Sequence, residues 1–120
     1  MSNITSHRGG NLLMVDCRRK IVLLLDRIIM LEGVANYTLF HLKDGKKRMF
    51  SHTLHTYEDD LAEYGFVRVH RGFIINSAYV RAIRNDDKQI VMENNLIATV
   101  SRRRSGMAAV KRFLSVHGER

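Results

Sequence analysis

The stretch Phe66–Ile83 most constrains the fold, because it alternates apolar runs of strand length with polar breaks. Its sequence is FVRVHRGFIINSAYVRAI, and the two breaks are His70-Arg71-Gly72 and Asn76-Ser77. Runs of this length are typical of short buried strands, and the breaks are typical of turns. The pattern predicts two short strands followed by a third, with His70 and Arg71 at a rim. Rims of rigid scaffolds are common places for binding residues.

Short apolar runs recur along the rest of the chain and predict further strands. Lys43-Asp44-Gly45-Lys46 is the clearest turn, since Asp-Gly supplies the positive φ angles of a two-residue hairpin turn. The segment 33–36 is predicted to be a loop. The predicted strands outside the central stretch are Leu12–Asp16, Lys20–Leu25, Ile28–Leu31, Tyr37–Leu42, Lys47–Ser51, Gln89–Glu93 and Leu96–Val100.

Two segments change to helical spacing. Leu54, Tyr57 and Leu61 share one face of a short helix, for which Thr53 is a candidate N-cap and Gly65 a candidate C-cap. The acids of this helix are expected to face away from any polyanion. A second helical pattern begins at about residue 105. Together these segments predict a mainly β fold of small antiparallel sheets, with eight to ten short strands and two short helices.

Length and charge limit the class of protein. A chain of 120 residues has room for one domain with one modest core, which is not expected to begin before Leu12. Lys and Arg outnumber Asp and Glu by 20 to 12, which favours a polyanion as partner. The single Cys17 cannot form an internal disulfide, so a cytoplasmic location is expected. No apolar run approaches the roughly 20 residues that cross a bilayer, so no membrane partner is expected.

Catalytic and metal-binding patterns are weak. His52 and His55 have a spacing close to that of paired metal ligands, but no cysteine pair or carboxylate stands at a matching offset, which favours surface histidines. Ser101 and His70 could belong to a hydrolase triad, but there is no Gly-x-Ser-x-Gly elbow. Phosphate loops and dinucleotide fingerprints are absent from the sequence. We therefore expect no enzyme activity, no cofactor and no metal.

The strongest constellation is basic. Arginine pairs two donors with guanine O6 and N7 or with phosphate oxygens, so arginines on loops suit both base reading and backbone contact. For Arg84, Lys88 and Lys111 a solvated surface charge is the favoured interpretation. For Arg71 and Arg102 we favour a nucleic-acid contact. The whole set comprises Arg71, Arg81, Arg84, Arg102, Arg103, Arg104, Lys111 and Arg112.

The aromatic residues help to choose between kinds of nucleic acid. Single-strand binders stack bases on exposed aromatic rings. Here only Tyr37 and Tyr57 look free, and duplex DNA is therefore the favoured target, with RNA as the second choice. The remaining aromatic residues that fall on apolar faces are Phe40, Phe50, Phe66, Phe73, Tyr79 and Phe113.

Four short pieces, in this order and with these gaps, resemble the LytTR family of bacterial DNA-binding domains. They are Ile28–Glu32 followed by Asn36-Tyr37, then Ser51–Leu61, Phe66–Ile83 and Thr99–Arg102. The similarity covers about residues 18–115. Residues 1–17 then form a flexible leader or linker remnant with a possible first strand, and residues 116–120 form a tail.

The resemblance implies a domain whose loops enter successive major grooves of a directly repeated DNA site. Gly72 stands where a small hydroxylated residue is more usual. Asn76 is interpreted as structural, since asparagine tolerates a left-handed turn. By motif position, base contacts are expected from Asn36, Arg71 and Arg102, and backbone contacts from His70, Ser77, Arg103 and Arg104.

The predicted function is a sequence-specific, duplex-DNA-binding transcription regulator. The alternative is a β-rich protein-interaction or sensor module whose basic face meets an acidic partner. Family members usually carry an N-terminal receiver or a membrane sensor, so this chain is either a stand-alone regulator or a fragment. Without a long amphipathic helix or heptads, a monomer is expected when the protein is free, with a second copy binding on repeated DNA sites.

Overall fold

The computed structural model describes residues 3–84, 86, 88–101 and 111. These residues form eleven strands, one α-helix and three short 3₁₀ helices. The elements are β1 (Ile4–His7), β2 (Gly10–Asp16), β3 (Ile21–Leu24), η1 (Leu25–Arg27), β4 (Ile28–Val34), β5 (Tyr37–Leu42), β6 (Lys47–Phe50), α1 (Leu54–Ala62), β7 (Phe66–His70), β8 (Phe73–Asn76), η2 (Ser77–Tyr79), β9 (Val80–Arg84), β10 (Gln89–Met92), η3 (Glu93–Asn95) and β11 (Ile97–Thr99).

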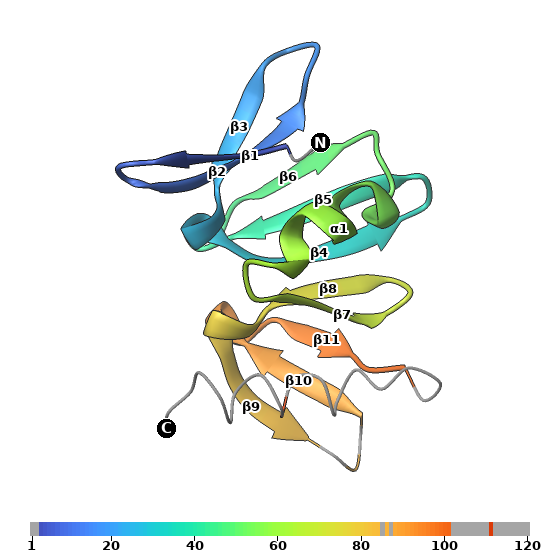
Figure 1. The fold of residues 1–120 in the computed structure, drawn as a ribbon. Coiled ribbons are helices and arrows are strands. Elements are labelled where there is room, and N and C mark those ends of the chain that lie inside the picture. Colours follow the sequence, from blue (N-terminus) through green and yellow to red (C-terminus); the bar gives the residue numbers. More distant parts are fainter. Residues whose placement is uncertain (1–2, 85, 87, 102–110, 112–120) are drawn as a thin grey trace.

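The strands form three antiparallel sheets that follow one another along the molecule (Figure 1). The first sheet has the order β1-β2-β3, the central sheet β6-β5-β4-β8-β7, and the last sheet β11-β10-β9. The predicted mainly β fold of small antiparallel sheets is therefore confirmed. The number of strands exceeds the eight to ten expected by one, and the pattern from residue 105 lies outside the described residues.

Strand β4 is the centre of the molecule because both of its faces are buried. Leu31 belongs to the core beneath α1, whereas Ile29 and Met30 belong to the core toward the last sheet. A register shift between Ile28 and Met30 in the pairing with β5 accompanies the change of face. A strand buried on both sides needs apolar residues at successive positions, which explains the continuous run in the sequence.

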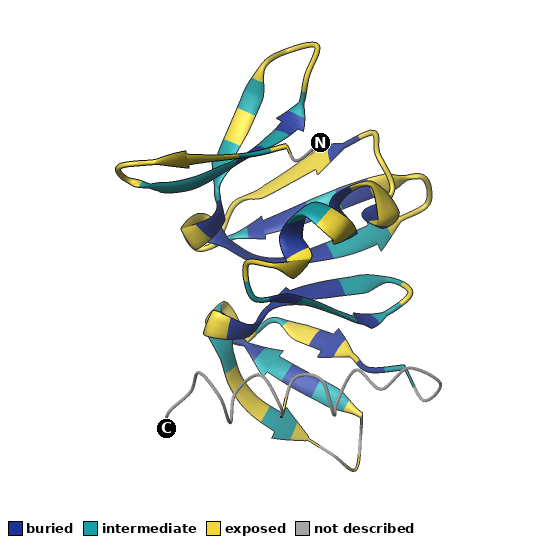
Figure 2. Cartoon of the chain, in the orientation of Figure 1, coloured by how far each residue is buried: buried dark blue, intermediate teal, exposed yellow. Residues whose placement is uncertain are grey.

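Two hydrophobic cores lie on opposite faces of the central sheet. The first contains Phe40, Leu61 and Ile74, and it is covered by α1 and by the first sheet. The second contains Val69, Ile75 and residues of the last sheet. Buried residues accordingly concentrate in β4, β5 and β8, while β1 and the turns are exposed (Figure 2). The single modest core predicted from chain length is in fact divided by the central sheet.

The strands begin earlier than the sequence predicts. Ile4–His7 pairs with β2 in antiparallel register, and Gly10 at φ 127° makes the turn between them possible. Ile4 also packs against the first core, so the core extends beyond Leu12. The prediction failed here because the other side chains of β1 are exposed, and an exposed polar strand has no apolar alternation to detect.

Helix α1 forms as predicted, with Leu54, Tyr57 and Leu61 buried against the sheet. Thr53 occupies the N-cap position, but its side chain makes no capping bond; its backbone carbonyl accepts from the Thr56 N–H. Gly65 has φ 85°, which suits the chain reversal after the helix. No helix in the described part of the chain has the length and apolar character to cross a membrane.

The turn after β8 depends on the side chain of Asn76. Its Nδ2 donates to the Ile28 carbonyl at 2.9 Å, and its Oδ1 accepts from the Ala78 N–H at 3.1 Å. The side chain is buried, so these bonds fix η2 against the start of β4. Asn76 is thus structural, but the predicted reason was wrong, because its φ of −89° is not left-handed.

The sequence makes two conflicting predictions for Tyr57, a place on the apolar face of the helix and a free ring, and the structure supports the first. Its ring packs edge-on against Phe40 in the first core, and its hydroxyl donates to the Val15 carbonyl at 3.2 Å. This bond joins α1 to the first sheet. Burial, and secondarily the charge of Asp16, raises the pKa of Tyr57 from 10.0 to about 12.

The raised pKa of Tyr57 predicts a loss of stability in alkali. An unfolded tyrosine ionises near pH 10, so between about pH 10 and 12 the folded state retains a proton that the unfolded state releases. The free energy of unfolding should fall over this interval, by up to about 3 kcal/mol. Urea unfolding of the wild type and of Tyr57→Phe across this range measures the effect. Equal losses of unfolding free energy in the wild type and in Tyr57→Phe would contradict this prediction.

Candidate nucleic-acid interface

Three segments that are distant in sequence meet at one edge of the molecule, here called the loop edge. It comprises the β4–β5 turn at Ala35-Asn36, the β7–β8 turn at Arg71-Gly72 and the end of β11 at Val100-Ser101 (Figure 1). Because antiparallel strands alternate in direction, the turns at the two ends of a sheet alternate as well. The β5–β6 turn and the three 3₁₀ helices therefore lie at the opposite edge.

Backbone hydrogen bonds connect the three segments of the loop edge to one another. The Gly33 N–H donates to the Gly72 carbonyl at 2.9 Å, which joins the β4–β5 hairpin to the β7–β8 turn. On the other side of that turn, the Ser101 N–H donates to the Val69 carbonyl at 2.8 Å. The β7–β8 turn is thus held from both sides, between Asn36 and the chain that leads into Arg102.

Gly33 also allows the start of α1 to approach the loop edge. A Cβ atom at this position would lie 3.3 Å from Cδ1 of Leu54, closer than ordinary van der Waals contact. It would also lie 3.9 Å from the Cα atom of Gly72. A Cβ atom at position 33 would therefore press on Leu54 and would be in ordinary contact with Gly72.

Arg68 holds the β7–β8 turn from beneath. Its Nε donates to the His70 carbonyl at 3.0 Å, and one terminal nitrogen donates to the Arg71 carbonyl at 2.6 Å. The other terminal nitrogen donates to the Glu58 carboxylate at 2.6 Å. The planar guanidinium meets these three acceptors from three separate nitrogens held in a fixed fork, whereas the donors of an ammonium group all sit on one atom. Arg68 thereby joins the turn to α1, and also neutralises one acid of that helix.

His70 adds a second local constraint on the same turn. Its Nδ1 accepts from the Gly72 N–H at 3.0 Å, and its ring lies against Phe73 with 5.8 Å between centroids. A ring nitrogen that accepts carries no proton, so the ring proton resides on Nε2. The half-buried His70 therefore has one nitrogen engaged in the turn and an N–H donor on the other.

Two predicted base-contacting residues lie on the loop edge. Asn36 is exposed in the β4–β5 turn, and Arg71 is exposed at the tip of the β7–β8 turn. The third, Arg102, directly follows the described Ser101 but lies outside the described residues, as do Arg103 and Arg104. The structure therefore brings together Asn36, Arg71 and His70.

Ser77 is placed elsewhere, and its predicted contact with the DNA backbone is not supported. It lies in η2, at the opposite edge from Asn36 and Arg71, and it is 2 % exposed. Its hydroxyl donates to the Gly65 carbonyl at 2.6 Å, and its N–H donates to the same carbonyl at 2.9 Å. A buried hydroxyl that is already bonded cannot reach a phosphate without opening of the turn.

A family model described as the LytTr DNA-binding domain matches residues 18–114. The chain belongs to the LytTR family. Among solved structures, the LytTr DNA-binding domain of a protein from Bacillus cereus, described as a methyl-accepting/DNA response regulator, superimposes with a TM-score of 0.67 at 21 % identity. The match covers 86 % of this chain and 95 % of that one, which shows a shared fold. No curated protein sequence matches the chain.

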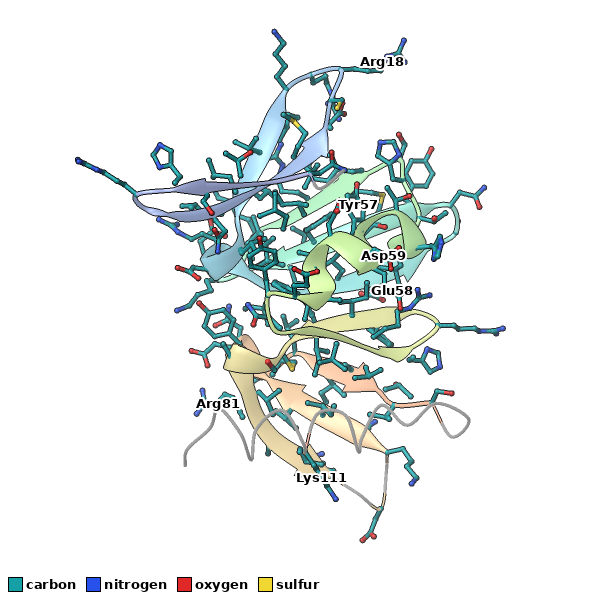
Figure 3. All side chains as sticks on the ribbon, in the orientation of Figure 1. Arg18, Tyr57, Glu58, Asp59, Arg81 and Lys111 are labelled. Atoms are coloured by element: carbon teal, nitrogen blue, oxygen red, sulfur yellow. The ribbon has the colours of Figure 1, made fainter. Side chains whose placement is uncertain are left out.

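The other basic residues of this LytTR domain are divided between the two edges. Arg81 and Arg84 are both exposed on β9 of the last sheet, and Arg81 lies on the side of the molecule away from the loops (Figure 3). Arg84 pairs with Gln89, which pairs in turn with Thr99, so Arg84 stands beside the end of β11 on the loop edge. Lys111 is also exposed. The structure thus divides the basic constellation: among its described members Arg71 and Arg84 stand at the loop edge, whereas Arg81 does not.

Sequence reasoning missed two residues of the loop edge in this LytTR domain. Arg68 looks like an ordinary strand arginine, and only the position of Glu58 on α1 reveals its role. Val34 is 38 % exposed, beside the β4–β5 turn where Tyr37 is 46 % exposed. In the sequence, an apolar residue at the end of a predicted strand is only a weak indication that its side chain is exposed at this edge. Within the described residues no group of three or more His, Cys, Asp or Glu could hold a metal.

Loss of the Arg68 side chain should loosen the β7–β8 turn of this LytTR domain. We expect Arg68→Ala to lower the free energy of unfolding by about 1–3 kcal/mol, because charged hydrogen bonds are lost in a partly buried place. We also expect faster hydrogen exchange of the Gly72 amide. Arg84→Ala, at an exposed strand arginine, is the control. Unchanged Gly72 exchange in a destabilised Arg68→Ala protein would rule out the positioning role.

Proposed function

We propose that this LytTR domain is a sequence-specific, duplex-DNA-binding transcription regulator whose loop edge enters successive major grooves. The observation that carries the proposal is the loop edge itself, where exposed Asn36 and Arg71 stand on turns that are bonded to each other. Base reading requires side chains on a rigid support, because a loosely held donor discriminates poorly between base edges. Arg68 and the bonds at Gly33 and Ser101 supply that support.

The dimensions of the molecule suit contact with more than one groove. Its longest extent is 42 Å, whereas one turn of B-form DNA is about 34 Å long. Neighbouring strands are about 4.8 Å apart, so the two hairpins and the end of β11 distribute their side chains along the edge. A single domain can therefore face two adjacent major grooves from one side of the duplex.

The charge distribution agrees with a polyanionic partner. The formal net charge is +8, which favours association with phosphates. Of the acids on α1, Glu58 is paired with Arg68, the residue that supports the β7–β8 turn. The exposed Asp59 follows it along the helix (Figure 3). The acid of α1 that is joined to the β7–β8 turn is thus neutralised.

Each residue of the proposed interface has a distinct role. Arg71 suits bidentate pairing with a guanine, and Asn36 suits pairing with an adenine. Arg102 takes the third base contact by its motif position. His70 donates to a phosphate from Nε2, and Arg103 and Arg104 contact the backbone. The exposed, unpaired Cys17 agrees with a proposed cytoplasmic site of action.

The base-reading roles predict losses that depend on sequence. Arg71→Ala and Asn36→Ala should each lower affinity for the preferred duplex by about 1–3 kcal/mol and relax the preference at one base position. Duplexes selected from a random pool by the wild type and by each variant provide the measurement. Arg81→Ala, at an exposed arginine on the side of the molecule away from the loops, serves as the control for removal of one positive charge. If Arg71→Ala lowered the affinity equally for every DNA sequence, Arg71 would be assigned a phosphate contact and not a base contact.

Cooperative binding of two copies to a repeated site should depend on the helical phase between the two sites. The radius of gyration is 13.7 Å, so one copy can occupy one site, and neighbours can touch only on the same face of the duplex. We expect a monomer in solution and cooperative binding when site centres are one turn of about 10–10.5 bp, or a multiple, apart. Insertion of about five base pairs should abolish cooperativity, as measured by titration of both duplexes. Undiminished cooperativity, or a tight free dimer in sedimentation, would exclude this arrangement.

A further inference from the structure

Two neighbouring cavities lie at the edge opposite the loop edge. One has a volume of about 290 Å³ and is lined by the β5–β6 turn and by η3. The other has a volume of about 320 Å³ and lies between the first sheet and the end of β5. Leu42 and Asp44 line both cavities, so the two adjoin each other, and together they are here called the rear groove. Strands β4 and β5 separate this groove from the loop edge.

One half of the rear groove is basic, and its turn is held on both sides. The Lys43 N–H donates to the Arg27 carbonyl at 2.9 Å, and the Lys43 carbonyl accepts from Asn94 Nδ2 at 3.1 Å. The ammonium group of Lys43 lies 4.8 Å from the centre of the Tyr79 ring. These contacts fix the backbone from which Lys46 and Lys47 extend, and both of those residues are exposed.

The other half of the rear groove is apolar. Leu12, Val22 and Leu24 of the first sheet line it, together with Leu42 of β5. Val22 is 44 % exposed, so the apolar surface is open to solvent. A cavity of this kind offers nothing to a phosphate backbone, but it can bury an aliphatic or aromatic side chain, which favours binding by the hydrophobic effect.

The charges of the rear groove are unbalanced. Its lining includes the cations Arg27, Lys43, Lys46 and Lys47 and the carboxylate of Asp44. That carboxylate already accepts from the Lys46 N–H at 2.9 Å. Among the described residues, no carboxylate forms an ion pair with the side chains of Arg27, Lys46 or Lys47. The groove therefore complements a ligand that carries negative charge beside apolar side chains.

We propose that the rear groove is a docking site for an acidic segment of a partner protein that also carries apolar side chains. Carboxylates of the segment pair with Lys46 and Lys47, and an apolar side chain enters the cavity at Leu12 and Val22. This site goes beyond the proposed DNA-binding function. Because it lies at the opposite edge, the same molecule can bind DNA and the partner segment together, which would connect a DNA site to a second protein.

The proposal can be tested with a phage library of random twelve-residue peptides. The library is selected on the full chain bound to a duplex and depleted on the Lys46→Glu/Lys47→Glu variant. We expect the enriched peptides to combine Asp or Glu with Leu or Phe. A labelled synthetic copy should bind the wild type, by fluorescence anisotropy, at least tenfold more tightly than the variant. Circular dichroism and duplex binding show that the variant is folded.

The matched control is Arg18→Glu/Lys20→Glu, which reverses two charges in the β2–β3 turn; Arg18 lies at the far tip of that turn (Figure 3). It should leave peptide affinity within about twofold of the wild type. Equal losses in the two double variants would reduce the effect to general charge attraction and overturn the proposal. Enrichment of peptides without acids, no enrichment at all, or competition between a short duplex and the peptide for the wild type would also overturn it.

Discussion

The pairing of the β7–β8 hairpin on both of its sides is the constraint on which the rest of the structure depends. Through Gly72 the hairpin is bonded to β4, and through Val69 it is bonded to the chain after β11. These bonds connect the central sheet to the last sheet at the level of the loop edge. Three segments from distant parts of the chain thereby acquire one orientation, which a surface that reads DNA requires.

Arg68 shows how an acidic helix and a basic edge can coexist in a small domain. Its guanidinium contacts Glu58 on α1 and the carbonyl groups of His70 and Arg71. The side chain is 14 % exposed, so the pair is shielded from solvent more than a surface ion pair would be. The same contact that neutralises an acid near the β7–β8 turn also fixes the shape of that turn.

The opposite edge is formed by the other ends of the same strands, but it is held together by different contacts. There the three 3₁₀ helices and the β5–β6 turn meet, joined by side-chain bonds such as those of Asn76 to Ile28 and Asn94 to Lys43. The hydroxyl of Tyr79 donates to the Asp26 carbonyl and adds a further link. Division of the molecule into two edges follows from strand alternation, and it separates the loop edge from the rear groove.

The sequence by itself determined the strands with clear apolar alternation, the Asp44-Gly45 turn, the buried face of α1 and membership of a DNA-binding family, because these depend on local periodicity and on short motifs. It missed β1, whose exposed side chains carry no periodic signal, it left Tyr57 undecided between a core-facing and a free ring, and it misplaced Ser77. The burial of both side chains depends on packing partners remote in sequence. Only the tertiary structure decided that Arg68 serves the β7–β8 turn, that Arg81 stands apart from Arg71, and that Lys46 lies beside an apolar cavity. The physical reason is that strand pairing and side-chain contacts join residues dozens of positions apart, and no local pattern records which of them meet.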